Sequence, residues 1–119
     1  LVEILEACCN KKLADINIEW TNKKSLCVVL CSKGYPDTYQ KNILIDNIEN
    51  LNLDENNFIF HAGTKKENDK IYATGGRVLN FISLSDDFLQ ARRKVHEYIK
   101  KLDWSGGFYR RDIGFKVID

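Results

Sequence analysis

Apolar residues recur along the chain at two different spacings, and the change between them predicts where helices and strands lie. Near the start they follow the i, i+3, i+4, i+7 spacing of an amphipathic helix over residues 1–12. This stripe consists of Leu1, Ile4, Leu5 and Cys8. Residues 14–24 are polar with an embedded Ile18 and Trp20, and we expect them to form a connection packed on the core. Residues 25–32 are a continuous apolar run, which predicts a strand buried on both faces.

The middle of the chain contains short apolar runs separated by polar and glycine-containing segments. Residues 33–42 predict a loop, and residues 43–55 mix apolar residues with Asn and Asp, so little regular structure is expected there. Three strands are then predicted, with a polar hairpin turn at 66–69 between the first two. They cover residues 57–64, 70–73 and 78–84.

Ser85-Asp86-Asp87 predicts the start of a long helix, Asp87 to Leu102, with Lys100 and Lys101 placed to complement its dipole. Several residues fall near one face of this helix, with Ala91 beside them: Phe88, Arg92, Val95, Tyr98 or Ile99, and Leu102. Residues 103–107 break the helix and residues 108–118 predict a final extended segment. We therefore expect an α+β fold: an antiparallel sheet packed with one long helix and a short N-terminal helix.

Composition restricts the class of protein. The 119 residues suit one domain, since domains of about 100–150 residues are common. A net charge of +1 gives no electrostatic case for nucleic acid or a membrane surface, and no apolar run approaches the roughly 20 residues that span a bilayer. The chain lacks methionine, so we expect it to be a piece of a longer polypeptide, and we place that polypeptide in the cytoplasm.

The four cysteines do not predict a disulfide framework. On one extended strand, Cys27 and Cys31 would lie about 13 Å apart, beyond the roughly 7 Å that a disulfide allows. The same distance prevents them from sharing one zinc ion. Pairing with Cys8 or Cys9 stays open, but free, buried thiols of a cytosolic protein are favoured.

Thr74-Gly75-Gly76-Arg77 is the most informative candidate for a binding loop. Two glycines between predicted strands allow another group to approach the backbone closely, and the arginine that follows is suited to a carboxylate or phosphate. The structural alternative is a hairpin turn or a bulge with no ligand.

Two other loops follow predicted strands. Gly34-Tyr35-Pro36 comes directly after the first strand, where ligand-contacting loops are common, although an ordinary turn is the alternative. Residues 61–65, His-Ala-Gly-Thr-Lys, offer an acid–base group in His61 and oxyanion donors in Thr64 and Lys65. Local hydrogen bonding is the more common role for such a histidine, and no third ligand at usable spacing predicts a zinc site.

The fourth loop is the segment Phe108 to Gly114, which pairs two guanidinium groups with a carboxylate. Arg110 and Arg111 would point to opposite sides of an extended segment, and Asp112 is placed to neutralise one of them. An ion pair without ligand is the alternative here. His96 and the run Arg92-Arg93-Lys94 predict a solvated helix surface.

Taken in order, these four loops resemble one known family. The chain is similar to the C-terminal domain of glycinamide ribonucleotide synthetase. The similarity lies in four motifs, preceded by the strand Val28-Val29-Leu30: Gly-Tyr-Pro, His-Ala-Gly-Thr-Lys, Gly-Gly-Arg-Val-Leu and Phe-Tyr-Arg-Arg-Asp-Ile-Gly. That enzyme, also called phosphoribosylamine–glycine ligase, belongs to the ATP-grasp superfamily. The resemblance covers essentially the whole chain, and Asp37 departs from the glycine usual in the family.

The resemblance implies an ATP- and Mg²⁺-dependent ligation of glycine to 5-phosphoribosylamine in de novo purine synthesis. It implies that the N-terminal and ATP-grasp domains of the same polypeptide are the partners, that they hold ATP and the metal, and that residues 1–12 are the tail helix of the ATP-grasp region. No catalytic or metal-binding residue is then expected in this piece. The implied substrate-binding residues are Arg77, Gly75, Gly76, Lys65, Gly34, Tyr35, Pro36, Arg110 and Asp112.

Two other functions stay open at this point. A non-catalytic module could bind nucleic acid or protein through Arg110, Arg111 and the Arg92-Arg93-Lys94 face, although the net charge near zero argues against nucleic acid. A purely structural domain, whose loops only pack, is the third reading.

Overall fold

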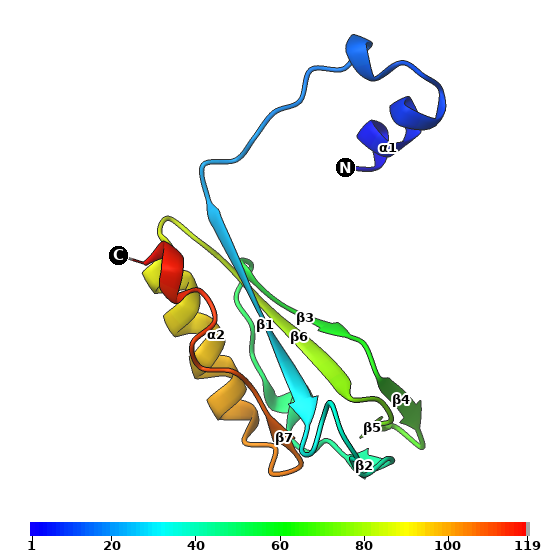
Figure 1. The fold of residues 1–119 in the computed structure, drawn as a ribbon, viewed down its shortest axis with the longest axis vertical. Helices are drawn as coiled ribbons and strands as arrows, with labels where there is room; N and C mark the ends of the chain where they lie inside the picture. Colours follow the sequence, from blue (N-terminus) through cyan, green and yellow to red (C-terminus); the bar gives the residue numbers. More distant parts are fainter. Residues whose placement is uncertain (119) are drawn as a thin grey trace.

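The computed structural model describes residues 1–118, and its central feature is a twisted sheet with one long helix along one face (Figure 1). The helices are α1 (Val2–Cys9) and α2 (Phe88–Leu102). The strands are β1 (Lys24–Ser32), β2 (Ile43–Leu44), β3 (Asn57–His61), β4 (Thr64–Glu67), β5 (Lys70–Ala73), β6 (Arg77–Ser85) and β7 (Gly107–Phe108). Short 3₁₀ turns cover Leu13–Asp15, Ile48–Asn50 and Phe115–Val117. The predicted α+β class is confirmed.

The four-stranded sheet has the order β3-β6-β1-β7, and its neighbours are antiparallel. Val28 of β1 lies opposite Phe81 of β6, and both are buried against α2. Val29 and its partner Asn80 point to the other face and are half-buried. The expectation that residues 25–32 are buried on both faces is therefore wrong, because a helix covers only one face and successive side chains alternate between the faces.

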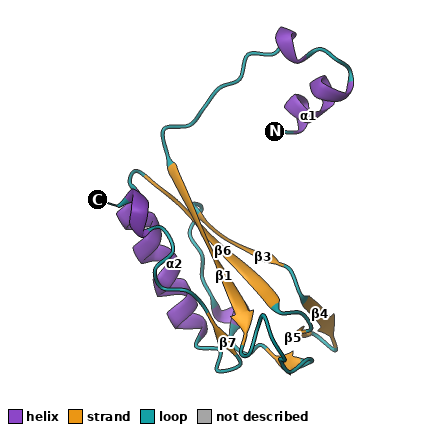
Figure 2. Cartoon of the chain, in the orientation of Figure 1, coloured by secondary structure: helices purple, strands orange, loops and turns teal. Residues whose placement is uncertain are grey.

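A second, three-stranded sheet with the order β2-β5-β4 lies beside the end of the first (Figure 2). The predicted strand 57–64 is interrupted at residues 62–63, so that β3 pairs in the large sheet and β4 in the small one. The hairpin between β4 and β5 turns at Asn68 and Asp69, both with positive φ, as a tight two-residue turn requires.

The segment 74–76 therefore joins β5 in one sheet to β6 in the other. A hairpin at Gly75-Gly76 is excluded, because the strands on either side of the glycines pair with different partners.

Helix α2 begins as predicted. The Asp87 side chain accepts a hydrogen bond of 2.7 Å from the Gln90 backbone N–H, which satisfies one of the free donors at the helix start. The buried face of α2 packs on β1 and β6. It consists of Ala91, Val95, Tyr98, Ile99 and Leu102.

The C-terminal segment differs from the prediction of a final strand. Only Gly107 and Phe108 pair with β1, at Ser32 and Cys31. The chain then leaves the sheet edge and runs along α2 to the 3₁₀ turn at Phe115–Val117 (Figure 1). Ile113 of this segment packs against the core. Burial of this apolar side chain is favourable and takes the place of further strand pairing.

Helix α1 stands apart from the sheets at the end of the extended connection 16–23 (Figure 1). Trp20 in that connection is 87% exposed, so it is not packed on the core as expected for residues 14–24. The thiols are free, but Cys8, Cys9 and Cys27 are exposed and Cys31 is half-buried, so the expectation of buried thiols is wrong. Within residues 1–118, the helices are too short or too polar to cross a bilayer.

Candidate functional site

Three of the four predicted loops meet in one hollow of about 530 Å³ on the sheet face turned away from α2. We call it the glycine hollow. It is lined by Val29, Tyr35, Ala62, Gly63, Gly76, Arg77 and Asn80. These residues come from strand β1 and the Gly-Tyr-Pro loop, from the break between β3 and β4, and from the start of β6.

Two glycines build the floor of the hollow because their backbones touch. A Cβ added to Gly63 would lie 2.6 Å from the Gly75 Cα and 2.7 Å from the Arg77 carbonyl oxygen. The Gly63 N–H donates to that same oxygen at 2.9 Å, and the Thr74 and Gly75 N–H groups donate to the Gly63 oxygen at 2.7 and 3.1 Å. Glycine is therefore needed here because two segments of the chain approach closely, and not because of positive φ.

Tyr35 forms one wall. Its ring lies against Gly76, where any side chain would collide with the ring. The loop is tied to the floor because the Ser32 N–H donates to the Gly76 oxygen at 2.8 Å and the Ser32 hydroxyl to the Gly75 oxygen at 2.9 Å. The Tyr35–Pro36 peptide bond is cis. The predicted Gly-Tyr-Pro and Gly-Gly-Arg loops are thus brought into direct contact.

Arg77 is the single charged side chain among the lining residues, and it lies exposed. Within residues 1–118, its guanidinium takes part in none of the hydrogen bonds or ion pairs. Its strand partner is Cys31. Burial raises the pKa of the Cys31 thiol, and the nearby positive charge of Arg77 partly opposes that rise. The site therefore combines an apolar and main-chain surface with one available cation.

The other residues of the His-Ala-Gly-Thr-Lys loop do not belong to the lining of this hollow. His61 is exposed, and its Nδ1 lies 2.9 Å from the Thr64 hydroxyl oxygen. The Lys65 ammonium pairs with Glu67 at 2.8 Å and lies 5.7 Å from the centre of the Tyr72 ring. Neither side chain lines the hollow, so only the small residues of this loop contribute to it.

The fourth loop lies elsewhere. Arg110 Nε donates to Asp112 Oδ1 at 3.0 Å, and the pair is solvent-exposed, with this hydrogen bonding lowering the pKa of Asp112. Arg111 lies over α2, where Arg92 Nη2 donates to its carbonyl oxygen at 2.5 Å. The structure therefore places Arg110 and Asp112 outside the glycine hollow.

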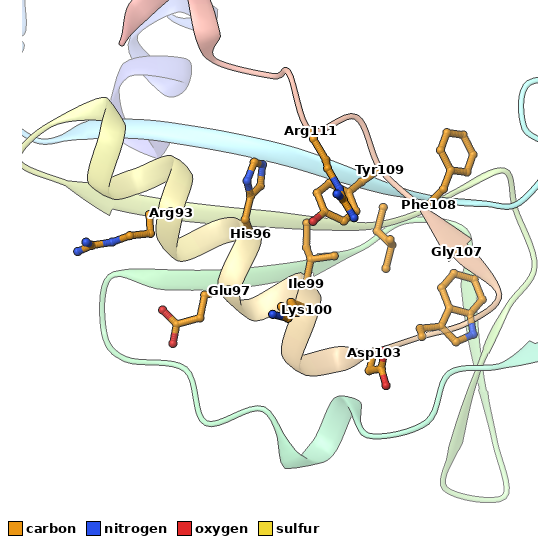
Figure 3. Close-up of a pocket in the computed structure, with 12 residues that line it drawn as sticks. Arg93, His96, Glu97, Ile99, Lys100, Asp103, Gly107, Phe108, Tyr109 and Arg111 are labelled. Carbon is orange, nitrogen blue, oxygen red and sulfur yellow. The ribbon is translucent and has the colours of Figure 1, made fainter.

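A larger groove of about 790 Å³ lies between the second half of α2 and the C-terminal segment (Figure 3). The His96 ring is 5.4 Å from the Tyr109 ring, and Figure 3 shows both side chains beside Arg111. His96 is half-buried, so the expectation of a surface residue is wrong. Burial, followed by the charges of Arg92 and Arg111, lowers the pKa of His96. No local sequence pattern indicated that His96 is half-buried, because Tyr109 and Arg111 belong to a segment that was expected to be a strand.

A metal site does not fit this part of the chain. Among residues 1–118, no three His, Cys, Asp or Glu side chains lie together in a way that could hold a metal ion. No residue here is therefore assigned to Mg²⁺.

The fold and the glycine hollow define an antiparallel α+β domain whose loops gather around one free arginine. Residues 25–116 match the family model described as phosphoribosylglycinamide synthetase, C domain, and the chain belongs to this family. The four loop motifs all lie inside the matched range.

Individual relatives of the chain support the same family assignment. A phosphoribosylamine–glycine ligase of Agrobacterium fabrum is 40% identical over 118 residues, which cover 99% of this chain and 27% of that protein. One from Fusobacterium nucleatum is 38% identical over 114 residues, 95% of this chain and 27% of that protein. The crystal structure of the phosphoribosylamine–glycine ligase from Thermotoga maritima superposes with a TM-score of 0.70 at 31% identity, covering 94% of this chain and 28% of that one. The chain thus spans about a quarter of the length of these relatives.

Proposed function

We propose that this domain closes one wall of the active site of an ATP-dependent ligase. The reaction joins glycine to 5-phosphoribosylamine and releases ADP and phosphate, in the cytoplasmic synthesis of purines. The support is membership of the synthetase C-domain family together with the names of the relatives, which are phosphoribosylamine–glycine ligases. The observation that carries the role of this domain is the glycine hollow, which three motif loops line together and to which Arg77 contributes the single charged side chain.

The chemistry of the hollow suits an anionic substrate group. Activation of a carboxylate by ATP and attack by an amine both place negative charge on oxygen atoms, and a fixed guanidinium stabilises such charge. Gly63 and Gly76 contribute main chain to the lining of the hollow. The Gly63–Gly75 contact and the Tyr35 ring against Gly76 hold that main chain in place. Arg77 is proposed to contact the substrate phosphate or the acyl-phosphate oxygens, with Tyr35 as the wall that orients the substrate.

ATP and Mg²⁺ are assigned to the remaining parts of the polypeptide. Residues 1–12 are proposed to be the tail of the ATP-grasp region, which is consistent with a family match that begins at residue 25 and with the separation of α1 from the sheets. None of Lys65, Arg110 and Asp112 lines the hollow. These residues are candidates for substrate contact only if the other domains bring the substrate to them.

The test is Arg77→Ala in the full-length enzyme. We expect kcat/KM for glycinamide ribonucleotide formation to fall at least about tenfold, which corresponds to about 1.4 kcal/mol of lost transition-state stabilisation. Lys66→Ala is the matched control, because it removes an exposed cation of strand β4 that pairs with Asp69 and does not line the hollow.

Unchanged kinetics in a folded Arg77→Ala enzyme would remove Arg77 from the site. If Arg77→Ala and Lys66→Ala reduce kcat/KM equally, a general loss of positive charge explains the effect, and the role of the hollow is refuted. A full-length protein that forms no glycinamide ribonucleotide at all would refute the proposed reaction itself.

A further inference from the structure

A second hollow, of about 330 Å³, lies along α2 at the point where the C-terminal segment crosses it. We call it the arginine hollow. It is lined by Leu89, Arg92, Arg93, His96 and Arg111. Three guanidinium groups and an imidazole thus surround one small space, and no acidic residue belongs to its lining as far as residues 1–118 are concerned.

The backbone arrangement holds these cations together. Arg92 and His96 are four residues apart on α2 and so lie on the same side of the helix, with Leu89 one turn earlier. Arg111 is added by the C-terminal segment, which Arg92 fixes by donating a 2.5 Å hydrogen bond from Nη2 to the Arg111 carbonyl oxygen. The cluster is therefore a product of tertiary structure.

Two nitrogen atoms of this cluster lack partners. Arg92 Nε and His96 Nε2 are buried, and no hydrogen-bond acceptor reaches either atom among the described residues. A buried polar group without a partner costs about 1–3 kcal/mol, so a native protein usually supplies one. Both residues line the hollow, where the exposed side chains of Arg93 and Arg111 lie beside them.

The nearest acidic side chains do not neutralise the cluster. Glu97 pairs with Lys101 at 2.8 Å, on the neighbouring turn of α2. Asp112 feels the charge of Arg92, but its hydrogen bonds go to Arg110. The charges of Glu97 and Asp112 therefore partly offset those of Arg93 and Arg92, but among the described residues no carboxylate forms a hydrogen bond or ion pair with Arg92, Arg93 or Arg111.

We propose that the arginine hollow binds a small oxyanion of the phosphate class, either inorganic phosphate or a phosphate monoester. The oxygen atoms of such an anion accept hydrogen bonds, and the three guanidinium groups of the lining can only donate them, which suits bidentate recognition. The hollow lies on the helix side of the sheet, whereas the glycine hollow opens on the other face. The proposal therefore does not depend on the proposed ligase function.

The experiment follows the imidazole NMR signal of His96 in the full-length protein, assigned by its loss in His96→Gln. Titration with inorganic phosphate, sulfate and ribose 5-phosphate is expected to give a saturable shift. Arg111→Gln and Arg93→Gln should each weaken this binding at least about tenfold. Arg93 makes no hydrogen bond or ion pair within residues 1–118, so its replacement leaves the fold intact. Lys94→Gln, which removes a neighbouring α2 cation paired with Asp54 at 3.7 Å, should change the affinity less than about twofold.

Comparison of the three titrated anions distinguishes a free inorganic anion from a phosphate monoester. Saturation by phosphate and sulfate alike identifies a free-anion site, and a clear preference for ribose 5-phosphate identifies a monoester site; both support the proposal. No saturable shift with any of the three probes overturns it, as does equal weakening by Arg93→Gln and Lys94→Gln. A shift produced by an RNA oligonucleotide but by none of the small anions also overturns it, because the surface would then bind nucleic acid.

Discussion

The two hollows of this domain are built in opposite ways. The glycine hollow has a floor of touching main chain, a network of backbone hydrogen bonds and one cation, Arg77. The arginine hollow has walls of side chains and four groups that carry or can accept positive charge. Backbone contacts fix the shape of the first, whereas charge determines what the second can bind.

This difference predicts different sensitivities. A hollow made of closely packed main chain cannot absorb an extra atom, so even one methyl group disturbs it. A hollow lined by side chains, of which Arg93 and Arg111 are exposed, tolerates substitutions in the fold but responds to pH and anions. Mutations can therefore show whether the two regions really differ in this way.

The largest effect is expected from Gly63→Ala. Its new Cβ would meet backbone atoms of Gly75 and Arg77 that cannot move separately, so the free energy of unfolding should fall by about 1–3 kcal/mol. Gly75→Ala should cost less, because only the Gly63 Cα, at 2.9 Å, is then too close. Arg93→Ala should change stability by less than about 0.5 kcal/mol. Urea unfolding measures all three, and a tolerated Gly63→Ala would show that the floor is not closely packed.

A smaller effect is expected in the pH dependence of stability. The pKa of His96 is lowered in the folded state, first by burial and then by Arg92 and Arg111. The unfolded chain therefore binds more protons than the folded one below about pH 6.5, and stability falls as the pH decreases through that range.

His96→Gln removes this contribution, so its unfolding free energy should decline less steeply between about pH 7 and 5 than that of the wild type. The measurement is urea unfolding in buffers without phosphate or sulfate. His61→Gln is the control, because His61 is exposed and lies away from α2. Identical slopes for wild type and His96→Gln would mean that His96 is as easily protonated as in the unfolded chain.

The smallest effect concerns the thiol beside Arg77. The pKa of Cys31 is raised by burial and partly restored by the Arg77 charge, whereas the pKa of Cys27 is raised by burial alone. Arg77→Ala should therefore slow iodoacetamide labelling of Cys31 by less than about tenfold and leave Cys27 unchanged, as peptide mass spectrometry can measure. Faster labelling of Cys31 in the variant would show that Arg77 shields the thiol more than it activates it.

Local patterns predicted the elements well where one segment suffices. The cap at Asp87, the buried stripe of α2 and the polar turn before Lys70 depend on neighbours within a few residues, and the structure has all three. The alternative of a hairpin at Gly75-Gly76 is excluded by the structure, and the sequence could not exclude it because a glycine pair does not reveal which sheet each flanking strand joins. The predicted final strand was wrong for a similar reason, since Ile113 packs on the core from beyond the sheet edge.

In the candidate sites, too, residues named by local motifs were predicted, whereas positions that depend on distant segments were not. Tyr35, Gly76 and Arg77 of the glycine hollow were predicted as candidate site residues, and the structure brings them together with Val29 and Asn80, which were not. His96 and Arg92 were expected on a solvated surface, yet both are half-buried beside Arg111. That position depends on a segment about 15–20 residues away in the sequence, for which no periodic pattern gives a signal.

The sequence by itself determined the α+β class, the positions of most helices and strands, and the four motifs by which the chain is placed in the synthetase C-domain family. Only the tertiary structure decided that Gly63 meets Gly75 across two sheets and that Arg111 meets Arg92 on α2. The physical reason is that periodicity and capping act over a few residues, whereas a hollow is formed by strand pairing and burial between distant segments. Those contacts become favourable only when the whole core has formed.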